Sequence, residues 1–273
     1  MSGMQDLIAI RGGGDLASGV GLRLHRAGFP VLVLEQTFPQ VVRRKVAFAE
    51  AVFLGQTQVE EVISRLIQSF DQAAACHLQG EVPVLVQPEE AFFEQLQPRV
   101  IVDARMLKQA VPSLTLSTDL LVGLGPGFTV GMNCHAVIET MRGHHLGRVF
   151  WEGSASANTG VPGSIAKHKL DRILRAPADG LLENSREIGE QIKQGELIAK
   201  VAGQPLVAPF DGVLRGLIHP SVPLVAGMKI GDLDPRNDPT FVSQVSDKSL
   251  AIGGAVLEAI LSHPHLRILN QHA

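Results

Sequence analysis

The chain has 273 residues, of which 45% are hydrophobic and 19% are charged. This apolar content is enough for a folded core and excludes an intrinsically disordered chain. The formal net charge of −3 argues against electrostatic binding of nucleic acid or of an anionic membrane over a broad surface. Two cysteines cannot build a disulfide framework, so we expect a cytoplasmic protein. The 28 glycines exceed average usage, and their positions indicate where function lies.

A glycine-rich loop follows the first apolar stretch, residues 7–10, which predicts a strand. The loop fits the G-x-G-x-x-A form of the dinucleotide fingerprint, in which glycines permit a tight turn and a close approach to pyrophosphate. A helical pattern and a second strand over residues 30–34 complete a βαβ unit. The sequence therefore predicts a nucleotide or related phosphate ligand here, and the alternative is a tight turn without a ligand. The candidate binding residues are Gly12, Gly14, Ala17 and Ser18.

An acidic residue closes the second strand. Glu35 lies about 20 residues beyond the glycines, where an acid usually binds a ribose hydroxyl. The basic cluster 43–45 follows, and it could contact a 2′-phosphate, another anion or solvent alone.

Alternating elements continue to the middle of the chain. The spacing of apolar residues predicts a helix over residues 59–70 and another over 89–96, with strands over 82–86 and 100–102. This order is typical of a mostly parallel sheet covered by helices. Asp103 and Arg105 directly follow the last of these strands, at the edge where open α/β sheets place ligands. They are candidates for function, and an ion pair is the structural alternative.

The densest polar cluster follows a predicted strand over residues 120–124. His135 and Glu139 are four residues apart and would share a face if the segment were helical. A metal site completed by His144, an acid–base pair and a structural network all stay open. Arg142 is a candidate for binding phosphate. Cys134 fits a small core residue better than a nucleophile.

An internal repeat occupies the last third. The pattern A-P-x-D-G at residues 176–180 recurs at 208–212, and an apolar-x-x-G-x-x-Ile pattern recurs at the same offset. The repeat resembles the two halves of a biotinyl/lipoyl-type barrel-sandwich hybrid. Lys229 aligns with Leu197 in a strand rather than with a carrier hairpin, so we expect no covalent biotin or lipoate.

Together these motifs resemble one family, the selenium-dependent molybdenum hydroxylase accessory proteins of the YqeB family. The resemblance runs over residues 6–262 and implies a role in maturing a molybdenum hydroxylase, without an established reaction. The motifs that carry it are Gly12–Gly19, Val137–Thr140, Arg142–His144, Gly153–Ala155, Asn158–Gly160, Ala208–Gly212, Lys229–Asp232 and Asp234–Arg236.

These observations predict an α/β fold: a Rossmann-like domain over residues 1–165, a barrel-sandwich hybrid over 170–236, and a closing helix and tail over 240–273. The leading hypothesis is an accessory factor that binds a nucleotide or molybdopterin-type cofactor, with Glu139, His144 and Asp103 as candidate catalytic residues. Its partners would be the hydroxylase apoenzyme or other maturation factors, and homo-oligomerisation stays open. The alternatives are an NAD(P)-dependent oxidoreductase and a non-enzymatic docking scaffold.

Overall fold

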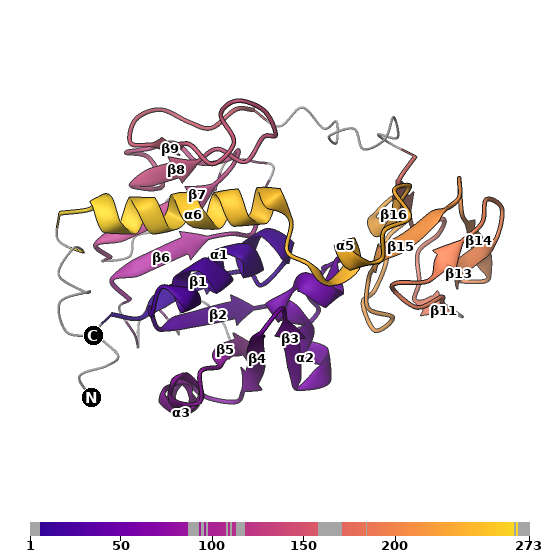
Figure 1. Cartoon of the computed structure of the whole chain (residues 1–273), viewed down its shortest axis with the longest axis horizontal. Helices are drawn as coiled ribbons and strands as arrows, with labels where there is room; N and C mark the ends of the chain where they lie inside the picture. The colour runs from indigo at the N-terminus through magenta and orange to yellow at the C-terminus, as the bar shows by residue number, and fades with distance from the viewer. Residues whose placement is uncertain are drawn as a thin grey trace.

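The computed structural model describes residues 6–86, 93, 96, 98–107, 109, 111–112, 118–157, 171–183, 185–264 and 266. Its regular elements form a large α/β region and a smaller part built from two antiparallel sheets, called the repeat module below (Figure 1). The predicted helix over residues 89–96 lies almost wholly outside the described residues, of which only Phe93 and Leu96 belong to it.

The α/β region contains a nine-stranded sheet in the order β3-β4-β5-β2-β1-β6-β7-β8-β9. Neighbouring strands are parallel from β4 to β8, and each edge adds one antiparallel strand. The strands are β1 (Ile8–Arg11), β2 (Val31–Glu35), β3 (Gln56–Val59), β4 (Val62–Ile67), β5 (Val82–Val86), β6 (Val100–Asp103), β7 (Leu120–Leu124), β8 (Ala136–Ile138) and β9 (Val149–Phe150).

The chain reverses its direction across the sheet at β1. Ile8 pairs with Val31 of β2 on one side and with Val100 of β6 on the other. The strands that follow β1 in the chain, β2 to β5, lie on one side of it. From β6 onward the strands lie on its other side. The carboxyl ends of β1 and β6 form a topological switch point, which is where open α/β sheets bind ligands.

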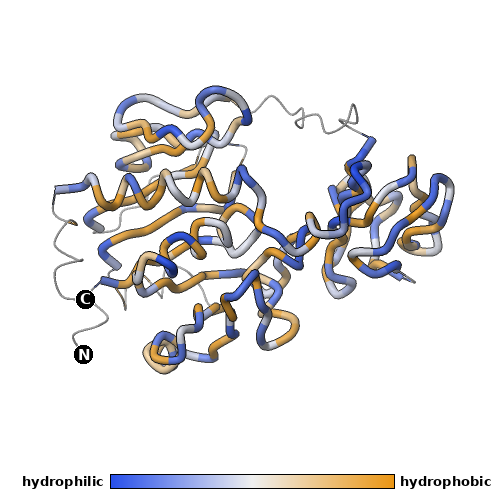
Figure 2. The backbone as a smooth tube through the Cα atoms, in the orientation of Figure 1, coloured by the Kyte–Doolittle hydropathy of each residue, from blue (hydrophilic) through white to orange (hydrophobic). Residues whose placement is uncertain are grey.

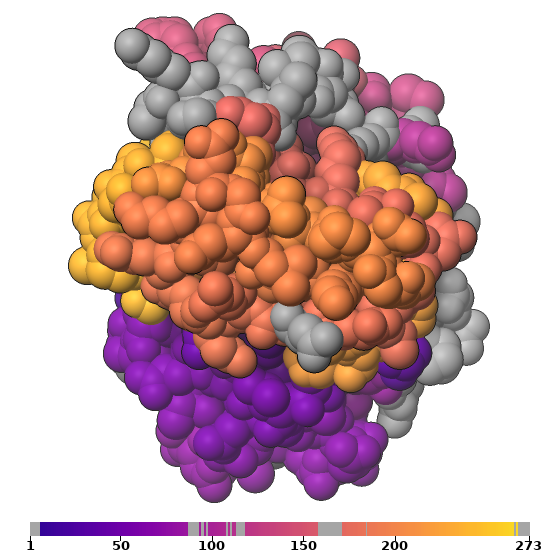
Figure 3. All heavy atoms as spheres, turned by 90° about the vertical axis from the view of Figure 1, so that its right-hand side faces the viewer, coloured from indigo at the N-terminus to yellow at the C-terminus, as the bar shows by residue number. Residues whose placement is uncertain are grey.

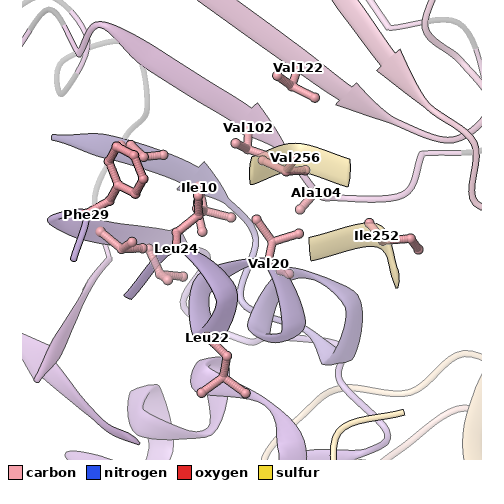
Figure 4. Close-up of a cluster of buried hydrophobic side chains, with 14 of the residues drawn as sticks. Ile10, Val20, Leu22, Leu24, Phe29, Val102, Ala104, Val122, Ile252 and Val256 are labelled. Atoms are coloured by element: carbon pink, nitrogen blue, oxygen red, sulfur yellow. The ribbon is translucent and has the colours of Figure 1, made fainter. Parts of the chain in front are cut away.

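Both faces of the sheet are buried, because strand side chains alternate between them. Ile8 and Ile10 of β1 pack on one face with α1 (Asp15–Arg26) and α6 (Asp247–Ser262), as Figure 4 shows for part of this cluster. Ala9 packs on the opposite face with α3 (Ala73–Leu78). The central strands are accordingly apolar up to their carboxyl ends, where Arg11 closes β1 and Asp103 closes β6 (Figure 2). The other short helices are α2 (Ala51–Leu54), α5 (Thr240–Ser243) and the 3-10 turns Arg44–Val46, Phe48–Glu50 and Phe70–Gln72.

Helices α1 and α6 lie side by side and parallel, although more than 200 residues separate them. Two glycines make this approach possible. A Cβ on Gly19 would lie 2.6 Å from the Cβ of Ser249, and one on Gly253 would lie 2.5 Å from the carbonyl oxygen of Gly19. The two amino termini therefore lie together at the carboxyl edge of the sheet.

The prediction of a helix over residues 59–70 is wrong. This segment contributes the end of β3, the strand β4 and the start of a 3-10 turn, with β3 and β4 forming an antiparallel hairpin. Glu60 occupies the left-handed region at φ 53° in the turn. The apolar spacing fits a helical face, but β-branched Val59, Val62 and Ile63 favour strands.

The repeat module contains a four-stranded sheet, β10-β16-β15-β12, and a three-stranded sheet, β11-β13-β14. No closed barrel is evident in the described residues. The strands are β10 (Ile173–Arg175), β11 (Leu182–Glu183), β12 (Gln191–Ile192), β13 (Leu197–Val201), β14 (Gln204–Val207), β15 (Gly212–Leu217) and β16 (Lys229–Asp234).

Hydrogen bonds confirm that the sequence repeat is a structural one. The carbonyl of Ala208 accepts the N–H of Gly195, and the carbonyl of Ala176 accepts the N–H of Gly227. The aspartates behave likewise: Asp211 accepts the N–H of Gln194 at 2.8 Å, and Asp179 accepts the N–H of Ala226 at 2.7 Å. Each A-P-x-D-G segment thus forms hydrogen bonds with the glycine turn of the other half, so the two halves interlock.

The repeat module packs against the α/β region (Figures 1 and 3). Arg44 donates to the carbonyl of Leu217 at 2.7 Å, and Phe53 stacks on His219 with ring centroids 3.8 Å apart. A Cβ on Gly216 would lie 2.7 Å from the carbonyl oxygen of Val42. Arg44 was one of the basic residues that the sequence offered as contacts for an anion. In the structure it connects the two parts of the molecule.

No helix in the described part of the chain is long and apolar enough to cross a membrane.

Candidate functional site at the carboxyl edge of the sheet

The glycine loop leaves β1 at the switch point. Gly12 has φ +91°, a conformation that L side chains rarely adopt, so glycine is required for this turn. Gly13 is packed, because a Cβ there would lie 2.9 Å from the backbone nitrogen of Ala49. A Cβ on Gly14 would meet only Val41, at 3.8 Å. The side of the loop at Gly14 is therefore open, as the fingerprint predicts for the position that a ligand approaches.

Two predicted ligand contacts bind the loop itself instead. Glu35 accepts the N–H of Gly13 at 2.8 Å through one oxygen and the N–H of Gln36 at 2.7 Å through the other. Ser18 is fully buried, donates to the carbonyl of Gly13 and accepts the N–H of Phe48. Ala17 is also fully buried, which suits its predicted packing role. The structure thus places Glu35 and Ser18 where they fix the loop conformation.

A buried ion cluster lies beside the loop at the end of β6. Asp103 is fully buried and accepts from Arg11 at 2.7 Å and from Arg105 at 2.7 and 3.0 Å. Arg11 is also buried, whereas the side chain of Arg105 keeps 29% exposure. Breaking a buried pair of this kind is costly because it leaves a charge without compensation. This geometry favours the structural alternative for Asp103, with Arg105 the member that solvent or a ligand can reach.

Glu139 follows β8 and is held by backbone donors. The N–H of Met141 donates at 2.7 Å and that of Ser156 at 2.8 Å. Burial alone would raise the pKa of Glu139, but hydrogen bonds from the hydroxyl and N–H of Ser156 and from neighbouring N–H groups bring it below its usual value. A carboxylate held ionised in this way can orient a loop or a ligand, and it is a poor proton donor.

The helix on which His135 and Glu139 would share a face does not form. They flank β8 and therefore lie at opposite edges of the sheet. His135 accepts the N–H of Leu121 at 2.9 Å and borders a cavity of about 430 Å³ with Asp119, Trp151, Ser262, His263 and Pro264. His144 is exposed and lies edge-on to His145. The described residues contain no group of three or more potential ligands for a metal.

Cys134 is buried, and burial raises the pKa of its thiol to about 11. A thiolate is therefore disfavoured at neutral pH, which agrees with a core role rather than a nucleophilic one.

The amino termini of α1 and α6 form the centre of the site. Asp15 accepts from Arg43 at 2.9 Å and from the hydroxyl of Ser249 at 2.8 Å. Arg142 donates both terminal nitrogens to Asp247 at 2.7 Å. These acids in the first turns of the helices offset the positive ends of two parallel helix dipoles. Arg142, predicted to bind phosphate, is thus engaged with Asp247 at the surface.

Two lysines at the site were not predicted from the sequence as site residues. Lys248 is the second residue of α6, and Lys229 is the first residue of β16 in the repeat module. The charge of Asp15 acts on both ammonium groups, and that of Glu139 also acts on Lys248. Loss of hydration is the main cause that lowers the pKa of each lysine, although residue Lys229 remains solvent-exposed. Lys229 belongs to the Lys229–Asp232 motif, which predicts a strand and not a ligand contact, and no motif includes Lys248.

Comparison with known proteins gave no matching family model. The chain is 46% identical over 259 residues to the Escherichia coli (strain K12) protein described as "Uncharacterized protein YqeB". The match covers 95% of this chain and 48% of that protein, so the chain spans about half the length of its curated relative.

Two solved structures were also found. A succinylglutamate desuccinylase/aspartoacylase from Rhodobacter sphaeroides is 14% identical, with a TM-score of 0.26 over 76% of this chain and 59% of the other. The ectoine utilization protein EutE (DoeB) from Ruegeria pomeroyi is 12% identical, with a TM-score of 0.22 over 84% and 57%. Both scores are too low to support a common fold or activity. The identity with the E. coli protein shows that this chain is similar to about half of that protein, in agreement with the resemblance described above.

Proposed function

We propose that this chain is an accessory factor in the maturation of a selenium-dependent molybdenum hydroxylase, acting in the cytoplasm. In this role it binds a nucleotide or a pterin-phosphate cofactor at the carboxyl edge of its large sheet. The hydroxylase apoenzyme or another maturation factor is its partner. No reaction is assigned, because the carboxylates Asp103 and Glu139 are held by arginines and by backbone N–H groups respectively.

One observation carries the ligand part of this proposal. Gly12 turns the chain at the topological switch point, and Gly14 leaves the start of α1 open to an approaching group. The first N–H groups of a helix lack intrahelical partners and favour an anion. Within the described residues, Ser18 is the first residue of α1 whose N–H donates inside the helix. A phosphate group at Gly14 would meet those earlier N–H groups.

The repeat module has a separate part in the proposal. We infer that its two interlocked halves form a barrel-sandwich hybrid that carries no biotin or lipoate and provides a rigid surface for the partner. Its outward apolar side chains, Leu181, Val207 and Val225, are 50%, 48% and 65% exposed. A contiguous apolar patch at a surface is typical of a contact site, and the proposal assigns these three side chains to such a patch.

The test uses Gly14→Val, because this substitution fills the open side of the loop, where a Cβ meets only Val41, at 3.8 Å. Gly14 has φ −70° and ψ −176°, which valine adopts freely. We expect the native protein to retain a nucleotide or pterin ligand detectable by mass spectrometry. The variant should lose it while keeping the melting temperature of the ligand-free native chain, because a bound ligand itself stabilises the folded state. Co-produced with its hydroxylase, the variant should yield enzyme of reduced activity. Retention of the same ligand by Gly14→Val would overturn the proposal.

An NAD(P)-dependent oxidoreductase remains the second candidate, favoured by the position of Glu35 at the end of β2. Its carboxylate would have to share the hydrogen bond from Gly13 with a ribose hydroxyl. The direct readout is a substrate-dependent absorbance change of the nicotinamide. Trp151 is an unsuitable reporter, because it borders the cavity at the opposite edge with His135. A ligand-free protein that binds only the apoenzyme would instead favour the scaffold hypothesis.

A further inference from the structure

Two cationic side chains at the site are not used by the fold. Within the described residues, neither Lys229 nor Lys248 has an ion pair or a side-chain hydrogen bond, whereas two neighbouring arginines are engaged with carboxylates. Arg43 bonds Asp15, and Arg142 bonds Asp247. Charged side chains that a fold does not pair are available to a ligand.

Strand β16 of the repeat module shows the same contrast between paired and unpaired charges. Asp232 and Asp234 of β16 are buried. Asp232 is paired with Arg172 and Arg215, each at 2.6 Å, and Asp234 with Arg236. The aspartates therefore have their own partners. Lys229 lies on the same strand and forms no ion pair within the described residues.

The two lysines come from different parts of the molecule, and contacts connect both parts to the start of α1. Gly231, two residues after Lys229 on β16, pairs with Leu217. The carbonyl of Leu217 accepts from Arg44, and Arg43, the residue before it, bonds Asp15. The charge of Asp15, at the start of α1, acts on Lys229 across the junction and on Lys248 beside it. The amino terminus of α6, where Lys248 lies, is next to that of α1. Asp15 and Asp247 are balanced by arginines, and Glu139 adds one negative charge near Lys248. The two positive charges of the lysines exceed that single charge, in a chain whose net charge is −3.

We propose that Lys229 and Lys248 bind the phosphate or diphosphate group of the ligand, so that the ligand is held jointly by the repeat module and the α/β region. This inference rests on the proposed function and specifies the chemistry of its site. The requirement for two ammonium groups fits a group carrying at least two negative charges. Nucleotides and pterin-phosphate cofactors share such a group, so the probe must test the phosphate alone.

The experiment is isothermal titration of the full chain with inorganic pyrophosphate at low ionic strength. We expect Lys229→Met and Lys248→Met each to weaken binding about tenfold, as loss of one charge-assisted hydrogen bond does. The double variant should show no measurable binding, and Lys229→Arg should retain most of it. Lys200→Met is the matched control, because Lys200 lies in the repeat module on β13, in the other sheet.

The outcomes separate this inference from the proposed function. Pyrophosphate binding that is unchanged in the double variant overturns the lysine assignment, and so does absence of binding by the native chain. Titration with the nucleotide or pterin found by mass spectrometry gives the second arm. If that ligand binds equally well to the double variant but not to Gly14→Val, the proposed function stands and the inference fails. If pyrophosphate binding needs both lysines but no organic ligand binds, the inference stands and the proposed function fails.

Discussion

The helix pair α1/α6 and the interlocked halves of the repeat module are both assembled from two similar pieces, and both depend on glycine. The physical need differs. At Gly19 and Gly253 a side chain would collide with the partner helix, although the backbone is ordinary helix. At Gly195 and Gly227 there is nothing within 4 Å, but φ is +82° and +80°. The helix pair therefore needs glycine for space, and the repeat needs it for backbone conformation.

The largest expected effect tests the need for space. Gly253→Ala should destabilise the protein by about 2–3 kcal/mol, because its Cβ would lie 2.5 Å from the carbonyl oxygen of Gly19 and the helices must separate. Gly254→Ala is the control, since a Cβ there has nothing within 4 Å. It should be neutral or stabilise the helix by up to about 1 kcal/mol. Urea denaturation measures both, and equal effects would contradict the close packing.

A smaller effect tests the need for conformation. Gly195→Ala and Gly227→Ala should each cost about 1–2 kcal/mol, because alanine is strained in the left-handed region. The two costs should match, since the turns are equivalent in the repeat. Gly195→Asn should cost less, because asparagine tolerates this conformation. Thermal unfolding of the three variants is the measurement, and unequal costs for the two alanine variants would break the symmetry.

The smallest effect concerns the charges at the start of α6. The hydrogen bonds from Arg142 lower the pKa of Asp247 from 3.8 to about 2. A folded-state pKa below the unfolded value contributes stability above the unfolded pKa, and this contribution is lost as the pH falls from about 4 to about 2. Both side chains are exposed, at 47% and 73%, so solvent screening keeps the contribution below about 1 kcal/mol.

The measurement is the urea midpoint at pH 5 and at pH 2.5 for the native chain and for Asp247→Asn. The difference between the two proteins should shrink at the lower pH and in 1 M salt. A difference that is as large at pH 2.5 as at pH 5 would assign the effect to helix capping instead of to the ion pair.

The sequence predicts the continuous apolar strands and the repeat well, since both have strong local patterns. β1, β2, β5, β6, β7 and α6 lie within a few residues of their predicted positions. Residues 59–70 were harder, because their apolar spacing fits a helix as well as a two-stranded hairpin. The choice depends on pairing with β5, since Ser64 pairs with Val82, and a local apolar pattern does not contain this contact.

The site was only partly predictable. The glycine loop and the edge of the sheet follow from the fingerprint and the strand order. Two interactions depend on tertiary contacts that local sequence patterns do not contain. They are the hydrogen bond from the Gly13 N–H to Glu35 and the ion pair between Arg142 and Asp247. Lys229 was identified as a strand residue, correctly. Its relation to Lys248 is invisible in the sequence, because it arises only when the repeat module packs on the α/β region.

The contact between α1 and α6 also has a consequence for biosynthesis. The repeat module is inserted between β9 and α6, so the core under α1 stays open until residues 252–260 have left the ribosome. Closing this core pairs the first helix with the last helix of the described chain, a contact of very long sequence separation, and such contacts slow folding. The repeat module, whose contacts are local, can fold earlier on the nascent chain. The contacts of α6 with the start of α1, such as the hydrogen bond from Ser249 to Asp15, therefore form only after the whole repeat module has been synthesised.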